Sequence, residues 1–130
     1  MVYEIKKSNP ELEIIINGGI TSIEGIKKQL DYVDGVMIGR AIYQNPYLLA
    51  DIEKIIFQNH VVLSREEVIQ HLIDYVKSEV EKGTRVNQIM RHTVGLYHGQ
   101  KGSSKWKRYL SDNMMAVSYT HLTLPTTPYV

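Results

Sequence analysis

The sequence of 130 residues contains no cysteine, one tryptophan, one phenylalanine and four prolines. Without cysteine, the chain can form no disulfide and no cysteine-ligated zinc site, and it offers no cysteine nucleophile or acid. No run of about 18 apolar residues occurs, so no transmembrane helix is expected. The N-terminal stretch MVYEIKKSNPELE also lacks the apolar core of a signal peptide. These absences predict a soluble, cytoplasmic chain with the length of about one domain.

Acidic residues are missing from residues 84–111, which contain six basic residues. The 15 basic and 14 acidic residues give a net charge of +1, but they are unevenly distributed. Residues 1–83 carry nine basic and thirteen acidic residues, whereas residues 84–130 carry six basic and one acidic residue, so the two parts have net charges of −4 and +5. A segment of one sign in a neutral protein predicts an anionic partner for that segment.

Two short β-branched runs in the first half are typical of buried parallel strands. The run LEIII at 12–16 ends at the glycine turn NGG, and the run VDGVMI at 33–38 ends at Gly39 and Arg40. A helix is predicted over 22–32, because Thr21 and Glu24 have the spacing of a capping box. The first half therefore predicts a βαβα unit, whose second helix begins at Asn45-Pro46.

The second half is predicted to be all-helical. Ser64 and Glu67 have capping-box spacing and open a helix that ends near Gly83. Further helices are expected over 86–97 and after Gly102. The last of these carries Trp106, whose helical spacing with neighbouring apolar residues is typical of a core position.

The two glycine turns are the strongest chemical signal in the first half. Glycines after a parallel strand let backbone N–H groups approach a ligand, and the start of the next helix adds partial positive charge. An arginine beside such a turn can add a charge-assisted contact. The sequence therefore predicts one phosphate site formed by Asn17, Gly18, Gly19, Gly39 and Arg40.

The chain is short for the fold that these elements indicate. The loops after the last two strands of a (β/α)₈ barrel are the usual phosphate site, but a complete barrel needs about 250 residues. The predicted fold class is therefore α/β plus all-α, in a fragment. Residues 1–58 would form the last βαβα portion of a TIM barrel, and residues 62–116 would form an appended helical domain.

Three blocks of the sequence resemble one family. EIIINGGI, VDGVMIGRAIYQNPYLLADI and RHTVGLYHGQKGSSKWKRYLSDN are similar to the C-terminal part of tRNA-dihydrouridine synthases of the A subfamily. The resemblance implies an FMN-dependent barrel that uses NADPH to reduce uridines 20 and 20a in the tRNA D-loop. It also implies that the helical domain helps to grip the tRNA.

The resemblance also implies roles for individual residues. The five residues of the predicted phosphate site would contact the FMN phosphate and its surroundings. The tRNA phosphates would be contacted by five basic residues, Arg91, Lys101, Lys105, Lys107 and Arg108. In this family a cysteine on a mobile barrel loop protonates C5 of the uracil, and this chain has none. The fragment alone is therefore expected to be inactive, with no catalytic residue and no metal, and a monomeric parent is favoured.

Two other functions fit parts of the sequence. Residues 62–113 could act as a stand-alone RNA-binding helical module. Alternatively, the barrel portion could belong to another FMN-dependent oxidoreductase such as a dihydroorotate dehydrogenase, which shares the glycine turns. The acid-free basic segment argues against a small-molecule oxidoreductase, because such an enzyme has little use for it.

The last fourteen residues differ from the rest of the chain. Residues 117–130 carry no charge and contain four of the seven threonines. The stretch VSYTHLTLPT at 117–126 resembles the translation of a sequencing-library adapter, which predicts that the native sequence ends near residue 116. A genuine tail rich in threonine and proline is the alternative.

Overall fold

The structure is a computed structural model that describes residues 1–114, so the predicted non-native tail lies outside the described residues. Two strands, β1 (Ile15–Asn17) and β2 (Gly35–Met37), lie in the first half. The helices of that half are α1 (Val2–Ser8), α2 (Ile23–Leu30), α3 (Arg40–Gln44) and α4 (Leu48–Ile55). The second half contains α5 (Arg65–Glu81), α6 (Val86–Met90), the 3₁₀ helix η1 (Arg91–Tyr97) and α7 (Ser103–Met114).

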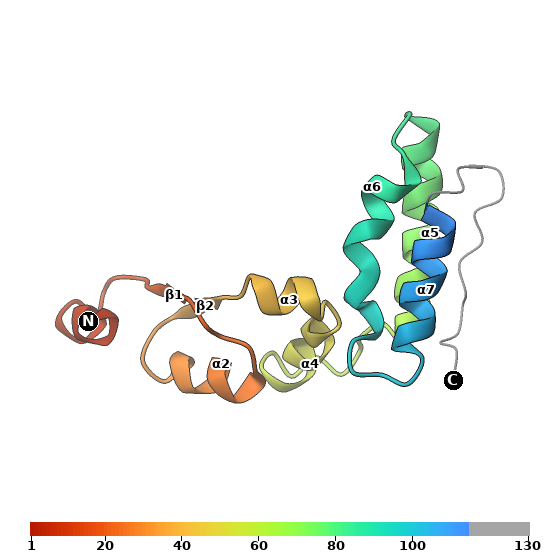
Figure 1. Cartoon of the computed structure of the whole chain (residues 1–130). Coiled ribbons are helices and arrows are strands. Elements are labelled where there is room, and N and C mark those ends of the chain that lie inside the picture. Colours follow the sequence, from red (N-terminus) through yellow and green to blue (C-terminus); the bar gives the residue numbers. More distant parts are fainter. Residues whose placement is uncertain (115–130) are drawn as a thin grey trace.

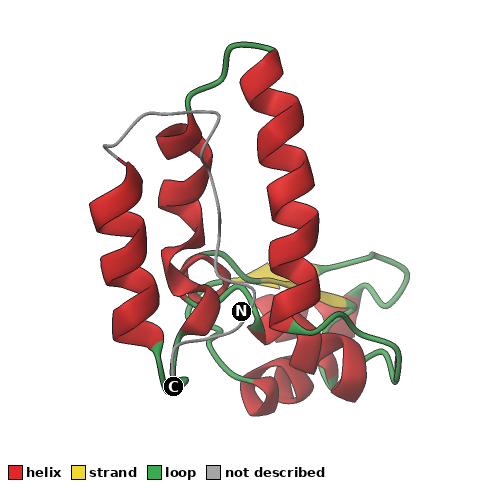
Figure 2. Ribbon diagram, turned by 90° about the vertical axis from the view of Figure 1, so that its right-hand side faces the viewer, coloured by secondary structure: helices red, strands yellow, loops and turns green. Residues whose placement is uncertain are grey.

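These elements form two parts that meet at α3 and α4. Figure 1 shows α1, the strands and α2 at one end of the molecule, and the upright helices α5, α6 and α7 at the other. The short helices α3 and α4 lie between the two parts. In the view of Figure 2, the long helices stand side by side to one side of the strands and short helices. The described residues are thus arranged as one part that contains the strands and one part that is helical.

The two strands pair in parallel, with Ile16 opposite Val36 and Asn17 opposite Met37. Helix α2 makes the connection between them, as a parallel pair requires. Because parallel strands run in the same direction, their carboxyl ends lie at one edge of the sheet. The two glycine turns therefore lie next to each other.

The prediction that both strands are buried was wrong. They are shorter than expected, and Ile15 and Met37 are 58% and 57% exposed. Strands of a parallel sheet are buried only when further strands and helices cover them. Here two strands form the whole sheet of the described residues, and an apolar hollow of about 580 Å³ lies between α2, β2 and α4.

Helix boundaries in the first half differ from the predictions in their capping. Helix α2 is capped by Ser22, whose hydroxyl accepts a hydrogen bond from the Gly25 N–H, and not by Thr21. Asn45 does not cap the next helix: it ends α3, and α4 begins at Leu48 without a side-chain cap. Helices α1 and α3 were not predicted at all. Thr21 and Ser22 can both cap a helix, and the packing of the chain determines which of them does so.

A small core holds the first half together. Its buried members are Ile20, Ile26 and Ile52, which come from the turn after β1 and from α2 and α4. Helix α1 is tied to this part by an ion pair between Lys6 and Asp34 at 2.7 Å. Asp34 also accepts a hydrogen bond from the Ile14 N–H at 2.8 Å. Asp34 therefore has a structural role, because it holds both Lys6 of α1 and the backbone before β1.

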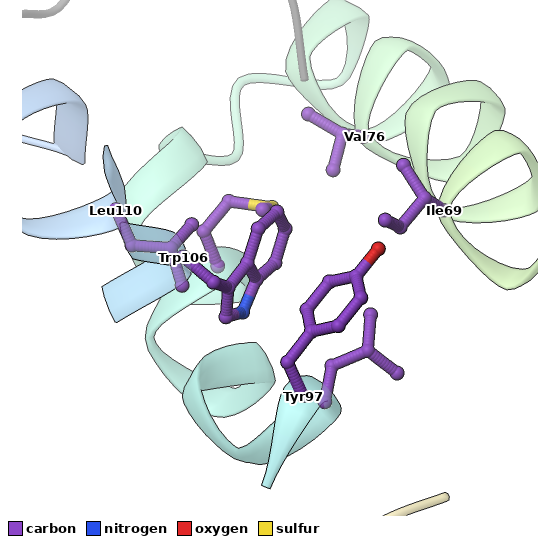
Figure 3. Packing of buried hydrophobic residues seen from close by; sticks show 7 residues of the cluster. Ile69, Val76, Tyr97, Trp106 and Leu110 are labelled. Atoms are coloured by element: carbon purple, nitrogen blue, oxygen red, sulfur yellow. The ribbon is translucent and has the colours of Figure 1, made fainter. Parts of the chain in front are cut away.

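The helical part has a larger core, which Figure 3 shows from close by. The rings of Tyr97 and Trp106 meet edge to face with their centroids 5.3 Å apart, and each residue is 1% exposed. The indole N–H of Trp106 donates to the Thr93 carbonyl at 2.9 Å. The core position predicted for Trp106 is confirmed. The fully buried members of this core include Ile69, Val76, Met90 and Leu110.

Two predictions about helices of the second half had different outcomes. The capping box of α5 is confirmed, because Ser64 accepts from the Glu67 N–H and Glu67 accepts from the Ser64 N–H. The prediction of a single helix over 86–97 was wrong, because this stretch divides into α6 and the 3₁₀ helix η1. Gly95 in η1 packs against the backbone at Gln44, which is a tertiary contact that helical periodicity does not report.

Candidate phosphate pocket and basic helical face

The predicted phosphate residues lie together in one pocket. A pocket of about 480 Å³ opens at the carboxyl ends of β1 and β2. Its lining contains all five predicted residues together with three that sequence reasoning missed: Asn17, Gly18, Gly19, Ile20, Thr21, Gly39, Arg40 and Ala41. The missed residues are direct neighbours of the glycine turns, and that adjacency is the signal that could have identified them.

Both glycines of the first turn have backbone conformations that favour glycine. Gly18 has φ of +122° and Gly19 has φ of +67°. At Gly18, Gly19 and Gly39, a Cβ atom would meet no other atom within 4 Å. The absence of side chains is therefore not required by packing against the protein. It leaves the backbone of both turns open to the pocket, as close approach to a ligand requires.

Arg40 supplies the positive charge of this pocket. It is the first residue of α3, it is exposed, and no described residue forms an ion pair with it. The first N–H groups of a helix have no partner within the helix and point out of its N-terminal end. A guanidinium group and open backbone at one pocket are suited to an anion, because both offer donors and neither offers a negative charge.

The five predicted tRNA-contacting residues are all exposed, and they lie between the start of η1 and the middle of α7. Arg91 begins η1, Lys101 lies in the turn before α7, and Lys105, Lys107 and Arg108 lie on α7. On α7 the buried side is marked by Trp106 and Leu110. The three basic residues of α7 therefore surround the opposite, solvent-facing side. Because Trp106 is buried, it is not available to stack on a base.

Arg65 has a role that the sequence did not indicate. Its Nε donates to the Leu96 carbonyl at 2.9 Å, and its guanidinium lies over the Tyr47 ring at 4.0 Å from the centroid. Tyr47 in turn donates its hydroxyl to the Leu63 carbonyl at 2.6 Å. This set of contacts joins α4, the connector and η1, so Arg65 fixes the two parts of the molecule to each other.

A second set of contacts joins α3 to η1. The hydroxyl of Tyr43 lies 2.9 Å from Nδ1 of His92, and Arg91 donates its Nε–H to Nε2 of His92 at 3.2 Å. His92 therefore contacts two side chains, one on α3 and one directly beside it in the sequence. The residues at this junction are exposed.

The described residues offer no cluster of three or more side chains suited to holding a metal ion. No helix within residues 1–114 combines the length and apolar character needed to cross a bilayer.

Comparison with known proteins shows the family to which the chain is similar. The profile of the dihydrouridine synthase family matches residues 1–124. The chain is 45% identical over 113 residues to the tRNA-dihydrouridine(20/20a) synthase of Shewanella oneidensis, covering 86% of this chain and 34% of that protein. It is 45% identical over 118 residues to the synthase of the same name from Synechocystis sp., covering 90% and 35%. The corresponding Escherichia coli O6:H1 protein is 41% identical over 113 residues, covering 86% and 34%.

The described residues thus form a parallel β-α-β unit, with a pocket of glycine turns and Arg40 at its carboxyl edge, followed by a helical part. The chain belongs to the dihydrouridine synthase family, which is a family of TIM-barrel enzymes. It spans about one third of the length of the curated relatives that it matches.

Proposed function

We propose that this chain is part of a flavin-dependent tRNA-dihydrouridine synthase that reduces uridines 20 and 20a of the tRNA D-loop with FMN and NADPH. The observation that carries the proposal is the convergence of Asn17, Gly18, Gly19, Gly39 and Arg40 on one pocket. These five residues lie in two turns that are about twenty residues apart in the sequence. Relatives covering most of the chain are named tRNA-dihydrouridine(20/20a) synthases, which supports the same reaction.

The residues at the pocket fit the phosphate of FMN. Gly18 and Gly19 leave space where side chains would otherwise stand, and Arg40 has no ion-pair partner among the described residues. In this proposal the backbone of the two turns and the guanidinium of Arg40 hold the phosphate. Bound FMN would supply the hydride chemistry, while this chain's own residues would anchor its phosphate.

The helical part would bind the tRNA backbone. Arg91, Lys101, Lys105, Lys107 and Arg108 are exposed, and contacts of this kind position a nucleic acid without reading its bases. This chain contains no cysteine to protonate the uracil. We therefore propose that the acid is supplied by another part of a longer enzyme and that the chain alone is inactive.

The comparisons favour this proposal over the two other functions. The curated relatives described above carry the name of a tRNA-dihydrouridine synthase and not of a dihydroorotate dehydrogenase. The matched segment includes both the pocket and the helical part, because the family profile covers residues 1–124. A helical module acting alone would not require the pocket at the end of the two strands.

The test separates the two sites in the full-length enzyme that we propose contains this chain. Arg40→Ala should lower the flavin retained per protein, measured by visible absorbance, while tRNA affinity changes little. The double variant Lys107→Ala/Arg108→Ala should weaken tRNA binding and reduce the slope of log K against log salt by about 2, with flavin content unchanged.

Lys77→Ala provides the control, because Lys77 is an exposed cation on α5 outside both sites. It should change neither flavin content nor the salt slope. Flavin loss in the Lys107/Arg108 variant, or an unchanged salt slope, would contradict the division of roles. Failure of the unmodified enzyme to form dihydrouridine in tRNA would overturn the proposed reaction itself.

A further inference from the structure

Three exposed side chains at the junction of the two parts form a continuous chain of contacts. Tyr43 lies on α3, and its hydroxyl is 2.9 Å from Nδ1 of His92 at the start of η1. The other ring nitrogen of His92, Nε2, accepts the Nε–H of Arg91 at 3.2 Å. The rings of Tyr43 and His92 meet edge to face, with centroids 5.8 Å apart.

The chemistry of the three groups determines the direction of both hydrogen bonds. A guanidinium group can only donate, so Nε2 of His92 must be the acceptor and carries no proton. In the neutral imidazole the single proton then lies on Nδ1, and it is donated to the Tyr43 oxygen. The Arg91 donor therefore selects this tautomer of His92, and Tyr43 holds the other side of the ring by accepting from the Nδ1–H.

The contact leaves Arg91 prepared for an anion. Its Nε–H is used by His92, and no described residue accepts a hydrogen bond from its two terminal NH₂ groups. A guanidinium held by Nε presents these two groups in a fixed plane, which suits a phosphate better than a freely rotating side chain. Arg91, His92 and Tyr43 are all exposed, so this arrangement is open to a large ligand.

The same contact links the two proposed sites. Helix α3 begins at Arg40, which lines the phosphate pocket, and one turn later it carries Tyr43. Arg91 is the first residue of η1, in the helical part. Arg91 is therefore connected to α3, the helix that follows the pocket, through the side chains of His92 and Tyr43.

We propose that Tyr43 and His92 are positioning residues that orient the Arg91 guanidinium for one phosphate of the tRNA. The inference rests on the proposed function, because it adds an orienting device to a residue already assigned to the tRNA face. Neither Tyr43 nor His92 is required to touch the tRNA. Both act through Arg91, and this dependence can be measured.

A double-mutant cycle tests the dependence in the 130-residue chain, with an unmodified transcript of tRNA as the probe and fluorescence anisotropy as the readout. Arg91→Ala should weaken binding about tenfold, as loss of a charge-assisted contact does. His92→Ala should weaken it about threefold, and Tyr43→Phe by a similar or smaller factor. In the Arg91→Ala background, His92→Ala should have no further effect.

The matched control pairs His92→Ala with Arg108→Ala. Arg108 lies on α7, and the side-chain partners of His92 are Tyr43 and Arg91, so the losses in affinity from the two substitutions should multiply. Circular dichroism and the unfolding midpoint of each variant separate a positioning role from a loss of fold. A merely structural role for His92 would weaken binding by the same factor whether residue 91 is Arg or Ala.

The outcomes distinguish the inference from the function on which it rests. If the factors by which His92→Ala and Arg91→Ala weaken binding multiply in the double variant, the positioning role is overturned while tRNA binding by Arg91 stands. If Arg91→Ala leaves binding unchanged but Lys107→Ala/Arg108→Ala weakens it, the assignment of Arg91 and the positioning role both fail. If the unmodified chain does not bind the transcript, the tRNA-binding role of the helical part fails with them.

Discussion

Gly95 of η1 lies directly against the backbone carbonyl of Gln44, at the end of α3. A Cβ atom placed on Gly95 would lie 2.1 Å from the Gln44 oxygen and 2.8 Å from its carbonyl carbon. The δ-carbon of Pro46 would be 3.2 Å away. Two segments separated by about fifty residues therefore approach so closely that only glycine fits. This contact brings the helical part against the end of the βαβα part.

Gly95→Ala should separate η1 from α3. Because the clash is with backbone and not with a flexible side chain, one segment must move, and we expect a loss of about 1–3 kcal/mol in the free energy of unfolding. Urea unfolding followed by circular dichroism measures this loss. Gly39→Ala is the control, because a Cβ there meets nothing within 4 Å. Equal losses in the two variants would contradict the close approach at Gln44.

The two glycines of the first turn should differ in their tolerance of substitution. Gly19, with φ of +67°, lies in the left-handed region that asparagine also adopts, whereas Gly18, with φ of +122°, lies outside it. Gly19→Asn should therefore cost less than about 1 kcal/mol of stability, and Gly18→Asn should cost about 1–3 kcal/mol. The difference between the two unfolding free energies is the measurement. A larger loss at Gly19 would show that the turn has another conformation.

The Tyr97 hydroxyl is buried and has no hydrogen-bond partner among the described residues. Burial raises the pKa of the Tyr97 phenol, and the Glu66 carboxylate raises this pKa further, while Arg65 opposes the shift. Tyr97→Phe removes an unpaired polar group, so it should increase the free energy of unfolding by about 1 kcal/mol at neutral pH. Because the phenol ionises less readily in the folded state, the parent chain should lose stability as the pH rises past about 10, the phenol pKa of the unfolded chain. Tyr97→Phe should remove this loss.

Tyr47→Phe is the matched control for Tyr97→Phe. The Tyr47 hydroxyl donates to the Leu63 carbonyl, so its removal should lower the free energy of unfolding by about 1 kcal/mol. The two substitutions delete the same atom and should act in opposite directions. The same sign for both would show that the Tyr97 hydroxyl has a partner in solution.

The ion pair between Lys6 and Asp34 predicts a dependence of stability on pH. The hydrogen bond from Lys6 and the bond from the Ile14 N–H hold the pKa of the Asp34 carboxyl below its ordinary value. Because the folded pKa is the lower one, the contribution is fully present above the unfolded pKa of about 4 and is lost as the pH falls through the folded value. The free energy of unfolding, measured from pH 7 to pH 3, should therefore differ less and less between the parent chain and Asp34→Asn as the pH falls.

Glu11→Gln is the control for this pH series, because Glu11 is exposed and forms no ion pair within residues 1–114. Its effect should be small across the series. A difference between the parent chain and Asp34→Asn that grows toward acid would mean that the carboxylate destabilises the folded state.

The features that sequence reasoning identified correctly are those with local causes. Two β-branched runs that end in glycine turns define the β-α-β unit, and the parallel pairing then brings Asn17, Gly18 and Gly19 next to Gly39 and Arg40. The reciprocal capping box of Ser64 and Glu67 uses only residues of one turn. The core position of Trp106 follows from its spacing with Leu110 along one helix.

The features that sequence reasoning missed depend on which segments meet in space. Ser22 and not Thr21 caps α2, although both can accept a hydrogen bond. The two strands are more exposed than their apolar sequence indicates, because burial depends on neighbours and only two strands are present in the described residues. The contact between Tyr43 and His92 spans forty-nine positions, and no spacing rule predicts it.

By itself, the sequence determined the β-α-β order of the first half, the glycine turns, the acid-free basic stretch over 84–111 and the family that the chain resembles. These follow from backbone preferences and side-chain periodicity within short stretches. Only the tertiary structure decided that Gly95 docks on Gln44, that Arg65 packs over Tyr47, and that Arg91 is held through His92. The physical reason is that steric fit and hydrogen-bond partners arise only when distant segments are packed together.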